Sequence, residues 1–228
     1  ELSQYHPFHF HTAVDCQTAF FLDFTDSPLR RKGRMTPQQR RKRQQLEERY
    51  GRPDPQAVRK DVHELLDRVV KENSAVTFRS DDHRSYRPAI RRLRARIRHE
   101  VTSSHDPRDR HNPLYEINLL DLLIRHAGAN HKRETIAWSK RRHGAALRLM
   151  VFLVWRNYVR PRWRKNCDVT PAMQIGLLDR ALTIEEILGQ RLFVWKAGLQ
   201  GRWAQYYWGE VETPALGVNR RHELKRAA

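Results

Sequence analysis

Apolar, β-branched and aromatic residues dominate the stretch from Phe8 to Phe24, and a single carboxylate, Asp15, lies inside the first half of it. Residues of these types favour extended chain. The polar residues 15–18 fall where a tight turn between two strands would lie. We therefore predict a β-hairpin with Asp15 at the end of its first strand. A carboxylate at such a position is costly to bury alone and usually has a cation or a metal ion beside it.

Two helix-start signals follow the hairpin. Thr36–Gln39 combines a capping threonine, a first-turn proline and a glutamine at the third position, and Asp54-Pro55 repeats the cap and the proline. We predict a basic helix over about 37–50, a turn through 51–53, and a second helix that ends near Asn73. Only the second helix repeats apolar residues at helical spacing, so we expect the first to lie on the surface.

The next region alternates short strands with a short helix. Ser74 to Asp81 has the composition of a strand and ends on a second carboxylate, Asp81, with Asp82 beside it. Tyr86 begins a short basic helix, and 97–102 is a candidate strand. With the hairpin, this order predicts an α/β fold in which helices pack on a mixed sheet.

The rest of the chain is predicted to be mainly helical. A long helical region begins at Pro113 and continues to about Tyr158, with expected interruptions at Gly128 and Gly144. Two short helices are predicted from the cap signatures at Thr170-Pro171 and Thr183–Glu186. The aromatic segment 190–228 has no clear periodicity, and its sequence assigns it no role.

Basic residues greatly outnumber acidic ones. The 228 residues include 44 Lys and Arg against 26 Asp and Glu, which gives a formal net charge of +18. This excess predicts a polyanionic partner, and nucleic acid is favoured because the arginines are spread over several elements. A basic protein that binds only other proteins is the alternative.

The cysteines and the apolar runs indicate the compartment in which the protein acts and whether it has a membrane partner. Cys16 and Cys167 fit no metal-ligand spacing and are too few for a disulfide framework, which favours a reducing, intracellular compartment. The longest apolar run, 147–158, is too short and too charged to span a bilayer, so we expect no membrane partner.

The order of carboxylates predicts a metal-dependent site. Two Mg²⁺ ions about 4 Å apart require hard oxygen ligands, one of them bridging, to transfer a phosphoryl group. Asp15 and Asp81 end two strands, and a third carboxylate would come from the helix after Pro113. That helix is mostly apolar, and Asn118, Asp121 and Arg125 form a polar stripe along it. Asp121 is therefore favoured as the third carboxylate. We predict that Asp15, Asp81 and Asp121 are the catalytic and metal-binding residues, with Glu134 or Glu116 as the alternative third carboxylate.

Simpler roles for the same side chains stay open. Asp15 has the position of a turn or cap residue, and Asp121 that of an ion-pair partner of Arg125. His9 and His11 would share one face of a strand and could bind zinc, although no further ligand stands at a suitable spacing.

Several motifs resemble those of the DDE-type transposases of bacterial insertion sequences. Thr135–Lys140 resembles the family's Thr-x-x-Phe-Ser-Lys segment, and Trp155–Val159 resembles its Tyr-x-Asn-Phe. Thr170–Glu186 resembles the ending Thr-Pro-Ala-Met-x-x-Gly-x-x-Asp-x-x-Trp-Thr-x-Glu-Glu, which is the most specific of these matches. Val14-Asp15 matches the family's first aspartate, and Arg79–Tyr86 resembles its Thr-Ser-Asp-Gly-His-x-x-Tyr, which favours Asp81 over Asp82.

The third carboxylate departs from the family pattern. Where the family reads Glu-x-x-Asn-x-x-x-Arg, this chain reads Asn118-x-x-Asp121-x-x-x-Arg125, so an aspartate stands one helical turn after the family's glutamate. One turn along a helix is about 5 Å.

The resemblance implies an RNase H-like fold and an activity. It implies a transposase that uses two Mg²⁺ ions, or Mn²⁺ in their place, to cleave DNA strands and to transfer them into a target. Its partners would be double-stranded DNA, both element ends and target, and further copies of the chain in a homodimer or higher oligomer. It would act in the bacterial cytoplasm at the nucleoid. A transposase-derived DNA-binding protein without cleavage activity and an RNase H-like nuclease or resolvase are the alternatives.

The resemblance also predicts how the chain is divided into a core, an insertion and an extension. Residues 1–160 would form the catalytic core with a basic helical insertion at 29–53, and 161–228 a C-terminal extension. Because the sequence begins almost on the first strand, we expect a DNA-end-binding domain to precede it. The basic residues expected to contact DNA are Arg40, Arg41 and Arg43 in the insertion and Arg91, Arg92 and Arg94 near the second carboxylate.

Overall fold

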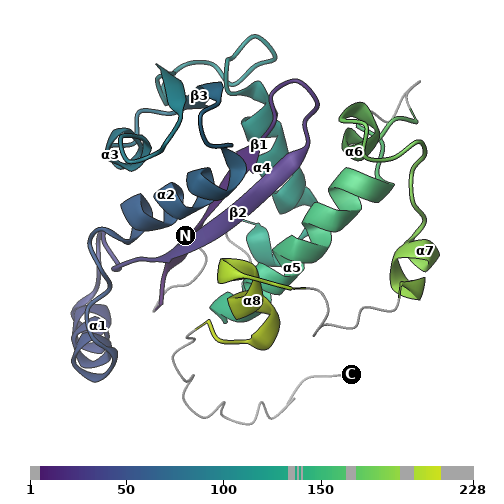
Figure 1. Cartoon of the computed structure of the whole chain (residues 1–228). Coiled ribbons are helices and arrows are strands. Elements are labelled where there is room, and N and C mark those ends of the chain that lie inside the picture. The colour runs from purple at the N-terminus through teal and green to yellow at the C-terminus, as the bar shows by residue number, and fades with distance from the viewer. Residues whose placement is uncertain are drawn as a thin grey trace.

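The computed structural model describes residues 6–132, 137, 139, 141–162, 168–190 and 198–211. These residues form a mixed α/β structure with two small sheets, one antiparallel and one parallel. Figure 1 shows the antiparallel hairpin running through the middle, with helices along its sides.

The first sheet is the predicted hairpin. Strands β1 (Phe8–Val14) and β2 (Phe21–Pro28) pair antiparallel, with Thr12 opposite Phe24, and the register shifts between Ala13 and Val14. The connection between them contains the polar residues 15–18, as their composition predicted.

The second sheet pairs β3 (Ala75–Ser80) and β4 (Arg96–Val101) in parallel, with the short helix α3 (Tyr86–Ile90) in the crossover. Both strands were predicted. The expected single mixed sheet is not observed, because among the described strands no backbone ladder joins this pair to the hairpin. Instead, β1 and β3 both line a cavity.

The basic insertion forms α1 (Pro37–Tyr50), with the boundaries that the sequence predicted. Thr36 and Gln39 cap it reciprocally, since the Gln39 N–H donates to Oγ1 of Thr36 and the Gln39 side chain accepts from the Thr36 N–H. No residue of α1 is buried, and the helix projects from one end of the fold (Figure 1). A helix with no apolar face has nothing to bury, so its exposure follows from its sequence.

Helix α2 (Ala57–Val69) is shorter at both ends than predicted. The Asp54 carboxylate accepts from the Gln56 N–H at 2.8 Å, which closes a turn before the helix begins. At the other end Val70 has an extended backbone (φ −100°, ψ 118°), which ends the helix, and Asn73 further on adopts a left-handed backbone with φ 59°. The buried side chains of α2 are Ala57, Val62, Leu65 and Leu66, and the last three belong to the apolar repeat that predicted the helix.

The long helical region divides into α4 (Tyr115–Ala127), a 3₁₀ turn at Ala129–His131, and α5 (Arg142–Val154), which continues into one π-helical turn at Trp155–Val159. Gly128 ends α4 as predicted. The interruption predicted at Gly144 is wrong, because Gly144 lies in the first turn of α5, where a glycine is tolerated.

Two short helices follow where their caps predicted them, α6 (Pro171–Gln174) and α7 (Ile184–Gly189). Thr170 and Thr183 accept hydrogen bonds from the backbone N–H groups of Met173 and Glu186. A further helix, α8 (Gly201–Trp208), lies in the segment to which the sequence assigned no role.

The main core lies between β2, α4, α5 and α8. It buries Phe21 and Phe24 of β2, Leu120 of α4, Leu149 of α5 and Tyr206 of α8, among others. A smaller cluster joins α2, α3 and β3. Within the described residues, no helix is both long enough and apolar enough to cross a membrane.

Candidate functional site

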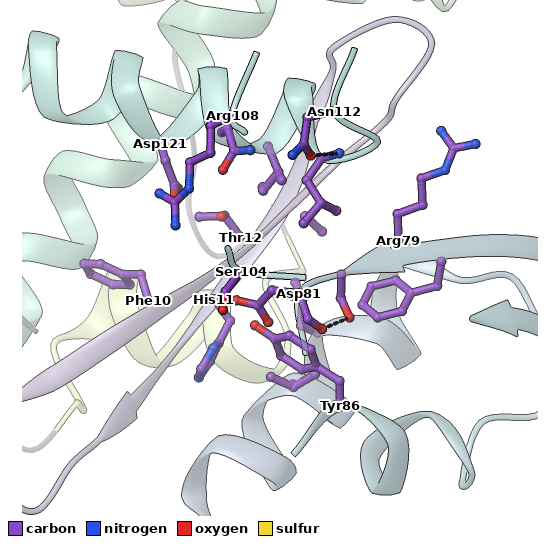
Figure 2. Close-up of a pocket in the computed structure, with 18 of the residues that line it drawn as sticks. Phe10, His11, Thr12, Arg79, Asp81, Tyr86, Ser104, Arg108, Asn112 and Asp121 are labelled. Atoms are coloured by element: carbon purple, nitrogen blue, oxygen red, sulfur yellow. Dashed lines mark hydrogen bonds between the residues drawn. The ribbon is translucent and has the colours of Figure 1, made fainter. Parts of the chain in front are cut away.

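A cavity of about 240 Å³ brings together two of the predicted carboxylates, Asp81 and Asp121. Residues 9–13 of β1 and 78–80 of β3 contribute to its walls, and Asn118 lies on the same face of α4 as Asp121. Figure 2 shows the Asp81 and Asp121 side chains in this cavity, with Thr12 between them in the view.

Asp81 reaches the cavity because β3 ends immediately before it. Its Oδ1 accepts from the His83 N–H at 3.1 Å, and its backbone carbonyl accepts from the Ser80 hydroxyl at 2.8 Å. These local bonds fix the chain where it leaves the strand. The neighbouring Asp82 does not line the cavity.

Asp121 reaches the cavity because α4 has two chemically different faces. Leu120 and Ile124 are buried in the main core, while the polar stripe presents Asn118 and Asp121 to the cavity. Arg125, the third member of the stripe, donates from Nε to the backbone carbonyl of Asp121 at 2.9 Å.

Tyr86, at the start of α3, interacts electrostatically with both carboxylates. Burial raises the pKa of its phenol, and the negative charges of Asp81 and Asp121 raise it further. Both carboxylates therefore lie within electrostatic range of one hydroxyl group.

The segment between β4 and α4 forms part of the cavity wall. Ser103, Ser104, Asp106, Arg108 and Asn112 all line it. The sequence identified this segment only as a polar loop, because nothing in its local pattern indicates which element it packs against.

Asp15 lies in the hairpin turn and is not among the residues that line the cavity. Its Oδ2 accepts from the Thr18 N–H at 2.8 Å and from the Thr18 hydroxyl at 2.5 Å. Its backbone N–H and carbonyl bond to Phe20 and Ala19. In this structure Asp15 thus has the turn-stabilising role that the sequence left open as its simpler interpretation.

The alternative third carboxylates lie elsewhere. Arg162 donates to the Gln17 carbonyl in the hairpin turn at 2.6 Å and to the Glu116 carboxylate at 2.8 Å, so Glu116 faces the turn rather than the cavity. Glu134 lies outside the described residues.

The cavity offers some of the oxygen ligands that a divalent cation needs. Asp81, Asp121 and the Asn118 amide offer hard oxygens at one cavity, and Mg²⁺ is commonly bound by one or two carboxylates with water and substrate phosphate as its other ligands. Across the described part of the chain, however, no three His, Cys, Asp or Glu side chains are grouped as a metal site. Two carboxylates of this kind could hold one ion. A third carboxylate, Asp106, also lines the cavity, but Asp15, the remaining ligand of the predicted two-ion arrangement, does not.

The predicted DNA-contacting arginines differ in their surroundings. Arg40, Arg41, Arg91, Arg92 and Arg94 are exposed. Arg43 is only partly exposed: it lies 3.4 Å from Glu47 and donates to the Arg31 carbonyl at 3.2 Å. Glu47 also takes two hydrogen bonds from Arg30. Arg43 therefore joins α1 to the segment before it.

The zinc interpretation is not supported by the contacts of His11. Its Nε2 lies 2.7 Å from the Ser27 hydroxyl, which in turn donates to the Asp61 carboxylate at 2.6 Å. Since the serine proton points to Asp61, His11 is the donor in the first bond. Burial lowers the pKa of His11 to about 3, and the nearby positive charges of His9, His83 and Arg202 act in the same direction.

Sequence reasoning missed the buried ion pairs to which this chain of bonds leads. Asp26 is fully buried on β2 and bonds to Arg142 of α5 and to the Tyr206 hydroxyl of α8. Arg202, also of α8, lies 3.6 Å from Asp26 and 2.6 Å from Asp61. Asp23 on β2 pairs with Arg68 of α2 at 2.7 Å. The sequence signal for these ion pairs was the presence of two aspartates, Asp23 and Asp26, in the apolar strand β2. Carboxylates in a buried strand require partners.

The motif Trp155–Val159 contributes to the fold. Asn157 is fully buried, and its amide bonds to both the N–H and the carbonyl of Phe21. Most of the motif Thr135–Lys140 lies outside the described residues; within it, Ser139 accepts from the Asn130 amide at 2.8 Å.

Comparisons of the chain with protein-family models, with curated proteins and with solved structures found no match.

Proposed function

We propose that this protein is a DNA-processing enzyme of the transposase type, with an RNase H-like catalytic core, that cleaves and transfers DNA strands with the help of Mg²⁺. The observation that carries the proposal is that Asp81 and Asp121, selected from separate sequence motifs, line a single cavity. The formal charge of +18 supports a polyanionic substrate.

In this proposal Asp81 and Asp121 hold the divalent ion, with the Asn118 amide as a neighbouring oxygen donor. A bound divalent ion would lower the pKa of an attacking water or 3′-hydroxyl and neutralise the leaving oxygen. Asp15 is the third candidate ligand. Because Thr18 holds its carboxylate in the hairpin turn, Asp15 would have to exchange this contact for the ion when DNA binds.

The DNA would be held mainly by phosphate contacts. Arg40 and Arg41 lie on a helix with no buried residue, and Arg91 and Arg92 come directly after α3, which begins at the cavity residue Tyr86. Exposed arginines of this kind bind phosphate without reading sequence.

A DNA-binding protein without cleavage activity is the second candidate. It is favoured by the grouping of only two of the three carboxylates, together with the local contacts of Asp15. A nuclease or resolvase would cleave without joining ends, and pre-cleaved element ends mixed with target DNA separate this case, since only a transposase joins them.

The deciding experiment compares Asp81→Asn, Asp121→Asn and the adjacent Asp82→Asn in an Mg²⁺-dependent cleavage assay on supercoiled DNA. The proposal requires that the first two variants lose detectable cleavage while still binding DNA, and that Asp82→Asn keeps it. Cleavage that survives both Asp81→Asn and Asp121→Asn would contradict it, and a wild-type protein that binds DNA without ever cleaving would favour the second candidate.

Salt dependence tests the DNA contacts independently. Each phosphate contact contributes a slope of about −0.9 to log affinity against log salt. Arg40→Gln and Arg41→Gln should each flatten the slope by about one contact. Arg43→Gln is the matched comparison on the same helix, since its guanidinium is engaged with Glu47 and the Arg31 carbonyl and should change the slope less.

A further inference from the structure

The cavity contains cations as well as carboxylates. Arg79 of β3 and Arg108 of the loop before α4 both line it, beside Asp81 and Asp121. Three carboxylates line the cavity, since Asp106 joins Asp81 and Asp121, and they repel a DNA phosphate; a single divalent ion offsets only part of their charge. A phosphate that enters this cavity therefore needs a further positive group.

The two arginines are not equivalent. Arg79 donates from Nε to the Glu100 carboxylate at 3.0 Å, so an acidic partner on the neighbouring strand already balances its charge. Arg108 belongs to an exposed loop, and in Figure 2 its guanidinium extends toward Asp121 within the cavity. Of these two cations, Arg108 is therefore the one whose guanidinium extends toward a proposed metal ligand, while Arg79 is engaged with Glu100.

The geometry of the loop suits contact with a substrate. Ser103, Ser104, Asp106 and Asn112 line the cavity with Arg108, so the loop contributes hydroxyl, amide and carboxylate groups to the same cavity. Asn112 is fixed locally, since its Oδ1 accepts from the Leu114 N–H at 2.8 Å and its Nδ2 donates to the Pro107 carbonyl at 2.6 Å. The second bond anchors the residue before Arg108, which limits where the arginine side chain can start.

We infer that Arg108 binds the phosphate on which the cavity acts, as a substrate-positioning residue beside Asp121. This inference rests on the proposed function, because it assigns a contact to the DNA substrate of the same cavity. A guanidinium binds phosphate in a bidentate manner, which fixes orientation as well as charge. Arg108 thereby holds the phosphate at the carboxylates, and in the absence of DNA its guanidinium lies toward Asp121.

The test compares Arg108→Gln and Arg108→Lys with Arg110→Gln, an exposed arginine of the same loop that does not line the cavity. DNA affinity is measured against salt concentration in Ca²⁺, and single-turnover cleavage at saturating DNA is measured in Mg²⁺. Arg108→Gln should flatten the salt slope by about one phosphate contact and reduce cleavage at least tenfold. Arg108→Lys should keep the slope but not the cleavage rate, because an ammonium lacks the bidentate fork. Arg110→Gln should leave cleavage unchanged.

The outcomes separate the inference from the proposed function. If the wild type cleaves and Arg108→Gln matches it in slope and rate, the inference is wrong and the proposed function stands. If the wild type binds DNA without cleaving, the proposed function fails, and the salt slope alone decides whether Arg108 contacts phosphate. If Arg108→Gln and Arg110→Gln flatten the slope equally, the loop is a general basic surface and the inference is wrong. If Arg108→Gln lowers the melting temperature and leaves the slope unchanged, Arg108 has only a structural role and the inference is wrong.

Discussion

The side-chain amide of Asn157 pairs with the backbone of Phe21 as another strand would. Its Oδ1 accepts from the Phe21 N–H at 2.9 Å and its Nδ2 donates to the Phe21 carbonyl at 2.8 Å, and both residues are fully buried. A residue of the π-helical turn after α5 thereby fixes the start of β2, which carries Asp23 and Asp26.

Replacing Asn157 with leucine should destabilise the fold strongly. The substitution leaves a buried N–H and a buried carbonyl without partners, at about 1–3 kcal/mol each. Urea unfolding should therefore show a loss of about 2–6 kcal/mol. Gln45→Ala, at an exposed position of α1, is the control and should change the free energy of unfolding by less than about 0.5 kcal/mol. Equal stability of the two variants would show that Asn157 is not a structural anchor.

The ion pairs of α8 lead to a second prediction. The Arg202 side chain is 12% exposed and bonds to the Asp61 and Glu64 carboxylates. Arg202→Met should lower the free energy of unfolding by about 3 kcal/mol, because it leaves the Asp61 carboxylate, which is only 13% exposed, without its cation. Arg94→Met is the matched control, since its pair with Glu72 spans 3.7 Å between largely exposed side chains. Exposed pairs contribute about 0–1 kcal/mol, so similar losses in both variants would contradict the prediction.

These examples show which features the sequence could predict. The hairpin turn, the caps of α1, α6 and α7, and the exposure of α1 depend on residues a few positions apart, so local composition suffices. The pair of Asp26 with Tyr206 joins residues 180 positions apart, and that with Arg142 joins residues 116 apart. No local pattern indicates which distant cation will meet a given carboxylate.

The candidate site was predictable to the same extent. Helical geometry selected Asp121, and the position after a strand selected Asp81, because both arguments are local. The separation of the two sheets, and with it the position of Asp15 outside the cavity, depends on how β1 and β3 approach each other. The contribution of Arg108 likewise depends on how a polar loop folds over α4.

Acid should destabilise the protein through His11. The pKa of His11 is about 3 in the folded chain, because of burial first, against an ordinary value of 6.5. Between these values the unfolded chain binds the proton and the folded chain does not, so stability falls as the pH falls below about 6.5. Burial likewise lowers the pKa of His131, to about 4. Each buried histidine contributes a slope of at most about 1.4 kcal/mol per pH unit.

The free energy of unfolding, measured with urea between pH 7 and pH 4, should therefore depend less steeply on pH in His11→Gln than in the wild type. The glutamine amide can still donate to Ser27 but does not titrate. The exposed His105→Gln controls for the loss of an imidazole elsewhere. If the free energy of unfolding changes with pH in parallel in the wild type and in His11→Gln, His11 does not contribute to acid destabilisation.

Asp15 combines a structural contact with a predicted catalytic role, and one substitution separates the two. In Asp15→Asn the amide oxygen can still accept from the Thr18 N–H and hydroxyl, so the hairpin turn and the free energy of unfolding should change by less than about 1 kcal/mol. A neutral amide is a much poorer ligand for Mg²⁺ than a carboxylate. If Asp15 joins Asp81 and Asp121 on the ion when DNA binds, Asp15→Asn should lose Mg²⁺-dependent cleavage while it keeps its stability and its DNA affinity. Thr18→Val removes the hydroxyl bond and keeps the carboxylate, so it should cleave at least as fast as the wild type. Cleavage that survives in Asp15→Asn but falls in Thr18→Val would confine Asp15 to the turn.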